Sequence, residues 1–113
     1  NRQPQFDLVI LGIGDDGHTA SIFPNQIGLW NSKSYCEVAE HPETAQKRVT
    51  LTGNIINNAK EVAFLVTGEN KAQKVFEIIE KKGNYTSYPA SLVAPDTGVL
   101  NWFLDADAGK LIE

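Results

Sequence analysis

The sequence predicts an α/β fold with an open, mostly parallel sheet and helices on both faces. Two apolar runs, Leu8–Leu11 and Val62–Val66, show no alternation of polar and apolar residues, which is typical of parallel strands covered on both sides. The second run is followed by a segment whose apolar residues recur at three- and four-residue spacing, as in a helix packed on a sheet. We therefore expect the two runs to lie side by side in one parallel sheet.

Length and composition limit the kind of protein. The 113 residues are 42% hydrophobic and 21% charged, with a net charge of -4, as expected of one soluble domain or part of one. The acidic balance argues against a nucleic-acid surface, and no apolar segment is long enough to cross a membrane. Cys36 is the single cysteine, so an internal disulfide is impossible and a cytoplasmic protein with a small-molecule ligand is expected.

The first run, Leu8–Leu11, is expected to be a central strand that leads into a glycine turn. Gly12 and Gly14 permit backbone conformations closed to other residues and bring N–H groups close to a ligand. A helical turn is expected over residues 19–23, where a proline follows. His18 then lies at the carboxyl end of the strand, where open α/β sheets bind their ligands.

The glycine turn has two other interpretations. Gly12, Gly14 and Gly17 match G-x-G-x-x-G, and Glu37 lies where a dinucleotide-binding fold places its ribose carboxylate. The two adjacent aspartates would repel a pyrophosphate, and Pro24 follows too soon for the long helix of that fold, so dinucleotide binding is disfavoured. An isolated Asp-Gly-His would otherwise indicate solvated aspartates and a histidine that only caps a helix.

The middle of the chain predicts a mixed region. Residues 25–34 are polar and contain glycine, and are expected to form a loop or short helix in which Trp30 is packed. Tyr35–Ala39 is expected to be a short strand with Cys36 at a structural position, because its acidic neighbour would not stabilise a thiolate. His41 precedes a proline in a polar turn and is expected to be a solvated surface residue.

The next elements follow the same patterns. Arg48–Thr52 is rich in strand-forming residues, and Thr52 is expected to cap a helix over residues 54–60. Gly68 ends the second apolar strand, and the helix after it extends to about Lys81. The core-facing stripe of this helix is expected to consist of Ala72, Val75, Phe76 and Ile79.

The C-terminal third is expected to complete the core. Residues 82–87 form a loop and Val99–Leu104 is the last strand, in which Trp102 and Phe103 close the core. Asp105 is expected to cap a terminal helix.

Lys71 is a candidate for binding an anion. It lies in the first turn of its helix, where the helix dipole disfavours a positive charge unless an anion joins it. A phosphate would bind both the free backbone N–H groups and the ammonium, and the alternative is a lysine that points to water. On propensity alone, a surface charge is one interpretation of Arg48.

Several segments together resemble one enzyme family. LGIGDDGHTASIFP is similar to the signature of 6-phosphogluconolactonases, within the larger family that also holds glucosamine-6-phosphate deaminases. RVTLT, LVTGENK, YPASLV and WFLD follow in the order of that family, so the likeness extends from Phe6 to Asp105. The residues after His18 resemble the lactonase branch, because deaminases typically read closer to HIAFNEP there.

The resemblance implies a Rossmann-like α/β domain, of which residues 1–113 form the C-terminal portion. Members of the family are longer and begin with strands and a Ser-Gly-Gly-type phosphate loop that this sequence lacks. Asn1 is not a usual first residue and no signal peptide is visible, so we expect the N-terminal half to be absent from this chain. A half-sheet is expected to expose apolar strand faces and edges, which makes that half a required partner.

The resemblance also implies a reaction. The expected substrate is 6-phospho-D-glucono-1,5-lactone, hydrolysed to 6-phosphogluconate in the oxidative pentose phosphate pathway. His18 is expected to act as the general base on a water molecule and Asp16 to orient its imidazole, while Arg48 and Lys71 hold the 6-phosphate. The backbone amides expected to stabilise the oxyanion belong to Gly12, Gly14 and Gly17.

No cofactor and no metal is expected, because no cluster in the sequence offers three ligands at plausible spacing. Two other functions remain open. A deaminase-like sugar-phosphate isomerase would use the same Asp16–His18 pair to move protons between sugar carbons. A non-catalytic sugar-phosphate sensor would keep Arg48 and Lys71 but do no chemistry.

Overall fold

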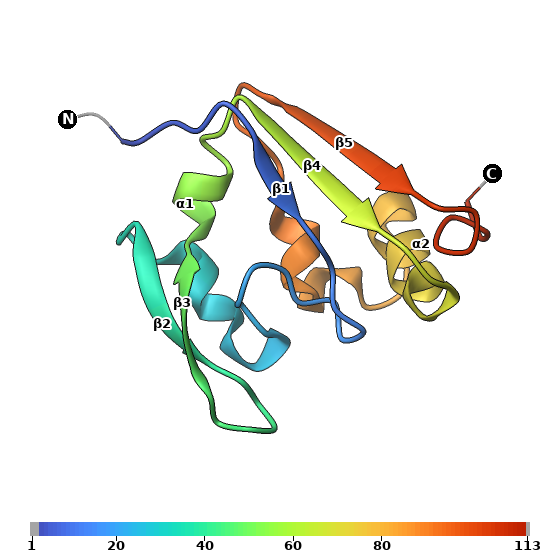
Figure 1. Ribbon diagram of the computed structural model, residues 1–113, viewed down its shortest axis with the longest axis horizontal. Coiled ribbons are helices and arrows are strands. Elements are labelled where there is room, and N and C mark those ends of the chain that lie inside the picture. The colour runs from blue at the N-terminus through green and yellow to red at the C-terminus, as the bar shows by residue number, and fades with distance from the viewer. Residues whose placement is uncertain (1–2, 113) are drawn as a thin grey trace.

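The protein, described here over residues 3–112 of a computed structural model, has a parallel sheet in front of a layer of short helices (Figure 1). Asn1, from which we expect the N-terminal half to be absent, lies outside the described residues. The strands β1 (Val9–Leu11), β4 (Glu61–Val66) and β5 (Val99–Leu104) form a three-stranded sheet in the order β1-β4-β5. The predicted parallel pairing of the two apolar runs is confirmed, with Val9 opposite Val62.

Short helices cover one face of this sheet. They are α1 (Gly53–Ile56), α2 (Ala72–Glu80) and the 3₁₀ helices η1 (Pro24–Asn31), η2 (Glu69–Lys71), η3 (Tyr85–Ser87) and η4 (Pro89–Leu92). No helix within residues 3–112 combines the length and the apolar character that crossing a membrane requires.

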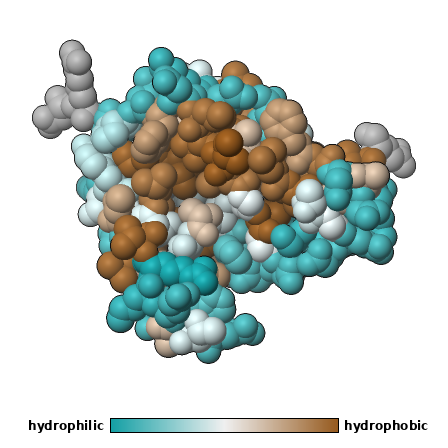
Figure 2. Space-filling view, in the orientation of Figure 1, coloured by the Kyte–Doolittle hydropathy of each residue, from teal (hydrophilic) through white to brown (hydrophobic). Residues whose placement is uncertain are grey.

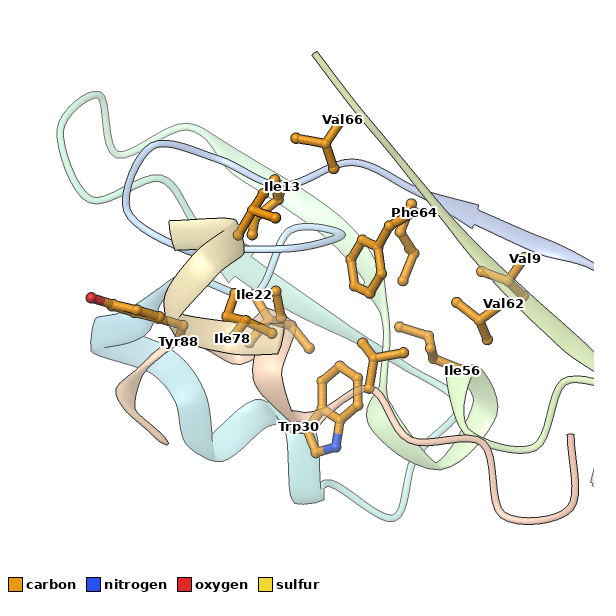
Figure 3. Packing of buried hydrophobic residues seen from close by; sticks show 14 of the residues in the cluster. Val9, Ile13, Ile22, Trp30, Ile56, Val62, Phe64, Val66, Ile78 and Tyr88 are labelled. Carbon is orange, nitrogen blue, oxygen red and sulfur yellow. The ribbon is translucent and has the colours of Figure 1, made fainter. Parts of the chain in front are cut away.

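The core lies between the helices and the covered face of the sheet (Figure 3). Phe64 of β4 is fully buried, and Trp102 of β5 stacks on it with the ring centroids 4.2 Å apart, as expected of a core aromatic. Helix α2 contributes Val75 as predicted, but Ile78 is buried where Phe76 was expected. Phe76 is only partly buried and lies outside the core cluster, so the predicted stripe was wrong at that position.

The opposite face of the sheet is bare and apolar. Ile10 is 58% exposed, Leu65 52% and Phe103 55%, and Figure 2 shows this face as a brown patch over the sheet. The expectation that a half-sheet exposes apolar strand faces is confirmed. Two other expectations are corrected. Within residues 3–112, β1 pairs only with β4 and is an edge strand, and Phe103 does not close the core because it faces the bare side.

A separate antiparallel hairpin flanks the main sheet. Its strands are β2 (Cys36–Glu40) and β3 (Lys47–Leu51), which confirms both predicted strands within one residue. Trp30 of η1 is buried as predicted. Cys36 of β2 is exposed, and its non-catalytic, structural role stays a prediction. Helix α1 is shorter than expected, and Thr52 at its start does not cap it, because its hydroxyl donates to the Ser34 carbonyl at 2.6 Å.

The chain after β5 forms turns rather than the predicted terminal helix. Asp105 still caps main-chain groups, since its carboxylate accepts hydrogen bonds from the N–H groups of Gly68 and Ala108. The bond from Gly68 joins the end of β5 to the end of β4.

Candidate active site

The turn after β1 folds back on itself through main-chain hydrogen bonds. The Gly14 N–H donates to the His18 carbonyl at 2.9 Å, and the Gly17 N–H donates to the Gly14 carbonyl at 3.0 Å. Both amides are therefore engaged within the turn, contrary to the expectation that they receive an oxyanion. Of the turn glycines only Gly17 has a positive φ, 88°, so the unusual backbone conformations expected at Gly12 and Gly14 are absent there.

Space, rather than φ, explains why residue 14 is glycine. A Cβ at Gly14 would lie 2.1 Å from both Cε1 and Nδ1 of His18, so the imidazole occupies the place of a side chain. At Gly17 a Cβ would lie 2.6 Å from the Tyr88 side chain. The turn thus packs His18 on one side and the core on the other.

Residues 19–23 form a tight turn and not the helical turn that the sequence predicts. The Ile22 N–H donates to the Thr19 carbonyl at 3.0 Å, and Ala20 between them has a φ of 51°. This turn places the buried Phe23 against His18, with the ring centroids 4.5 Å apart. The imidazole of His18 therefore packs against the Phe23 ring.

His18 and Asp16 are hydrogen-bonded to each other. The ring Nδ1 lies 2.6 Å from Asp16 Oδ1, and the His18 main-chain N–H donates to the same oxygen at 3.0 Å. Burial opposes ionisation of Asp16, but the hydrogen bonds and charge of His18 outweigh it and lower the pKa of this carboxyl below its ordinary value. A carboxylate at Nδ1 assigns the ring proton to Nδ1, which leaves a basic lone pair on Nε2.

His18 and Asp16 line an open pocket of ≈ 550 Å³. The lining residues are Gly14, Asp15, Asp16, His18, Phe23, His41, Pro42 and Glu43. A second hollow of ≈ 310 Å³ is also lined by His18, together with residues that include Gly12 and Thr19. The imidazole is thus accessible from two hollows at the carboxyl end of β1, where the sequence predicted a site.

His41 also lines this pocket, although its sequence context predicted no site there. It lies in the loop between β2 and β3 (Figure 1). Its ring packs edge-to-face with the Phe23 ring, with the centroids 5.1 Å apart. His41 is half-buried, so the expectation of a solvated surface histidine is only partly met. The sequence gives no signal for this position, because only the folding of the hairpin brings residue 41 to residue 18.

The start of α2 is tied to the glycine turn. Lys71 Nζ donates to the Ile13 carbonyl at 2.6 Å, and the Asn70 amide donates to Asp15 Oδ1 at 2.9 Å. Asp15 is exposed. Lys71 is thus brought to the site loop, where it contacts main-chain oxygen rather than the His18 ring.

Arg48 approaches the site from the hairpin. Its guanidinium carbon lies 5.8 Å from the centroid of the Phe23 ring, and its Nε donates to Gln46 Oε1 at 3.0 Å. Phe23 is therefore flanked by His18, His41 and Arg48. No group of three or more His, Cys, Asp and Glu side chains that could hold a metal occurs in the part of the chain that the structure describes.

Comparisons with known proteins agree on one family. Residues 1–102 match the family described as "Glucosamine-6-phosphate isomerases/6-phosphogluconolactonase". The chain is 44% identical over 110 residues to 6-phosphogluconolactonase of Homo sapiens, covering 96% of this chain and 42% of that protein. It is 42% identical over 107 residues to 6-phosphogluconolactonase of Aggregatibacter actinomycetemcomitans, covering 95% of this chain and 46% of the relative.

A solved structure extends the likeness to three dimensions. The solved structure of 6-phosphogluconolactonase from Trypanosoma brucei superposes with a TM-score of 0.85 at 32% identity, covering 97% of this chain and 43% of that one. The chain thus spans less than half the length of the relatives it matches.

Proposed function

Because this chain belongs to the family of glucosamine-6-phosphate isomerases and 6-phosphogluconolactonases, we propose that the complete protein hydrolyses 6-phospho-D-glucono-1,5-lactone to 6-phosphogluconate. Its place is the oxidative pentose phosphate pathway, in the cytoplasm. The observation that carries the proposal is the hydrogen bond of 2.6 Å between Asp16 and His18 Nδ1, beside an open pocket. This arrangement supplies a base with one fixed tautomer next to room for a substrate.

In the proposed mechanism, His18 Nε2 takes a proton from a water molecule as the water oxygen attacks the lactone carbonyl. The carbonyl oxygen becomes an oxyanion, and the bond between the carbonyl carbon and the ring oxygen then breaks. The protonated His18 returns its proton to the departing ring oxygen, which becomes a hydroxyl. Asp16 holds the imidazole in place and stabilises its positive charge while it carries the proton.

The 6-phosphate is held by Arg48 and Lys71 in this proposal. Arg48 lies beside Phe23, and Lys71 lies on the glycine turn, so both cations border the site but neither lines the pocket around His18. Binding the phosphate away from the reacting carbonyl allows remote binding energy to position the lactone against the base.

The bare face of the sheet fits the same proposal. Exposed apolar side chains at Ile10, Leu65 and Phe103 form a surface of the kind that is normally covered. We assign the N-terminal half of the complete domain as its cover, with β1 pairing through its free edge. The 113-residue chain alone is then expected to self-associate and to be inactive.

The deciding experiment follows the disappearance of freshly generated 6-phosphogluconolactone with the complete protein, against the spontaneous background. His18→Ala should lower turnover by about 10²- to 10⁴-fold with little loss of fold, because it removes the general base. Equal turnover of the variant would remove His18 from the mechanism. Absence of any acceleration, together with ammonia release from glucosamine 6-phosphate, would replace the proposal by a deaminase-like activity; phosphate-ester binding without either reaction would indicate a sensor.

A further inference from the structure

The side chains that line the pocket beside His18 offer more hydrogen-bond acceptors than donors. Three of its side chains, Asp15, Asp16 and Glu43, are carboxylates and only accept hydrogen bonds when ionised. His18 also presents an accepting lone pair, because Asp16 fixes its proton on Nδ1. A sugar lactone bound here brings a carbonyl oxygen, which becomes the oxyanion and needs a donor.

His41 is the side chain that meets this need. Its Nδ1 accepts hydrogen bonds from the main-chain N–H groups of Glu43 at 3.1 Å and Thr44 at 3.2 Å. A ring nitrogen that accepts from N–H groups carries no proton, so the neutral imidazole carries its proton on Nε2. The two histidines of the site therefore have opposite tautomers, with a free acceptor on His18 and a free donor on His41.

The surroundings hold the His41 ring in this state. The loop is closed by the His41 N–H donating to the Gln46 carbonyl and the Ala45 N–H donating to the His41 carbonyl, both at 2.9 Å. The ring lies edge-on to the buried Phe23, which also supports His18. Among residues 3–112, none accepts a hydrogen bond from His41 Nε2.

We infer that His41 is a substrate-binding residue, whose Nε2–H donates a hydrogen bond to an oxygen of the bound sugar-phosphate lactone. The inference rests on the proposed lactone hydrolysis and deepens it, since the Gly14 and Gly17 amides are already engaged within the turn. His41 then supplies a hydrogen-bond donor in the pocket that His18 also lines.

Two variants separate the pocket contact from the loop contact. In His41→Asn the side-chain oxygen reproduces the acceptor at the Nδ1 position, so the loop hydrogen bonds are kept while the Nε2–H is lost. In His41→Gln the side-chain amide places a donor near the Nε2 position while the loop acceptor is lost. Thr44→Ala is the control for the loop, because the Thr44 hydroxyl accepts the Gln46 N–H and does not line the pocket.

The measurement is kcat/KM for the lactone in the complete protein. His41→Asn should lower it about 3- to 10-fold, the range for one lost hydrogen bond, and His41→Gln should lower it less. Thr44→Ala should behave as the wild type. A His41→Asn enzyme equal to the wild type beside an impaired His41→Gln enzyme would overturn the inference, since His41 would then serve only the loop.

A binding titration with 6-phosphogluconate distinguishes failure of this inference from failure of the proposed function. The dissociation constant should rise about 3- to 10-fold in His41→Asn, whether or not the protein turns over lactone. A wild-type protein that binds the ligand through His41 but does not hydrolyse lactone retains the inference and overturns the proposed function. An active wild type whose affinity for 6-phosphogluconate is the same in His41→Asn overturns the inference alone.

Discussion

Asp16 Oδ1 accepts both hydrogen bonds that His18 directs to it, from ring Nδ1 at 2.6 Å and from the main-chain N–H at 3.0 Å. One oxygen thus fixes both the backbone and the ring of the histidine. The pair is only two residues apart, so the tight glycine turn is what allows the side chain of the first to reach the ring of the second.

Replacing Asp16 with Asn tests the role of its charge. An amide oxygen still accepts from His18, but it no longer stabilises the protonated ring, so kcat should fall about 10- to 100-fold, as for one lost charged hydrogen bond. Steady-state lactone hydrolysis at fixed pH measures this change. An Asp16→Asn enzyme with the wild-type kcat would show that Asp16 only shapes the turn.

Asp16→Asn should also lower the free energy of unfolding, by an amount that depends on pH. The folded-state pKa of Asp16 lies below its ordinary value of 3.8, so its contribution is present above that pH and is lost as the pH falls through the lowered pKa. Because the side chain is 44% exposed, the contribution should be less than about 1 kcal/mol. Urea unfolding of wild type and Asp16→Asn should show a constant difference from neutral pH to about pH 4, and a difference that shrinks progressively as the pH falls further.

Gly14→Ala should disable the site by displacing the base. The new Cβ would lie 2.1 Å from the His18 ring, so the imidazole must move, and a misplacement of about 1 Å can lower the rate about 10²-fold. Gly28→Ala is the matched control, since a Cβ at Gly28 meets nothing within 4 Å. Lactone turnover and circular dichroism of both variants are compared; a fully active Gly14→Ala enzyme would mean that the His18 position seen here is not the catalytic one.

Lys71→Ala tests phosphate binding against a purely structural contact. Loss of a charged hydrogen bond to the 6-phosphate should weaken substrate binding by about 1.5–3 kcal/mol and relieve inhibition by inorganic phosphate. Asn70→Ala is the control, because it breaks the neighbouring bond to Asp15 without removing a charge. If Lys71→Ala lowers stability but leaves substrate binding and inhibition by inorganic phosphate unchanged, Lys71 has only a structural role, through its hydrogen bond to the Ile13 carbonyl.

Tyr88→Phe tests a hydrogen bond behind the glycine turn. The Tyr88 hydroxyl donates to Glu77 Oε1 at 2.6 Å, and this bond together with burial raises the pKa of Tyr88 to about 12. The variant should lower the free energy of unfolding by about 1–2 kcal/mol at pH 8. Tyr35→Phe, at a tyrosine that is 47% exposed, is the control and should change it little.

The difference in the free energy of unfolding between wild type and Tyr88→Phe should decrease at high pH. The folded state favours the neutral tyrosine, so the stabilisation is complete below the ordinary pKa of 10.0 and declines as the pH rises toward about 12. Urea unfolding of wild type and Tyr88→Phe between pH 8 and 11.5 should show the two curves converging. A difference that grows with pH would contradict this account.

Several elements were predictable because each depends on a pattern of residues close together in the sequence. Apolar runs gave β1, β4 and β5, and the spacing of apolar residues gave α2. One error was to assign two adjacent residues of a strand to the same face. Trp102 and Phe103 were both expected in the core, yet adjacent strand residues point to opposite faces, so only Trp102 packs on Phe64.

The sequence by itself determined the strands, the glycine turn and the Asp16–His18 pair, because strand patterns and a two-residue spacing act within a few residues of chain. Only the tertiary structure decided that His41 joins the site, and that His18, His41 and Arg48 all pack around Phe23. Those contacts depend on how the β2–β3 hairpin packs against the turn after β1, and that packing is fixed by buried surface shared between distant segments rather than by any local pattern.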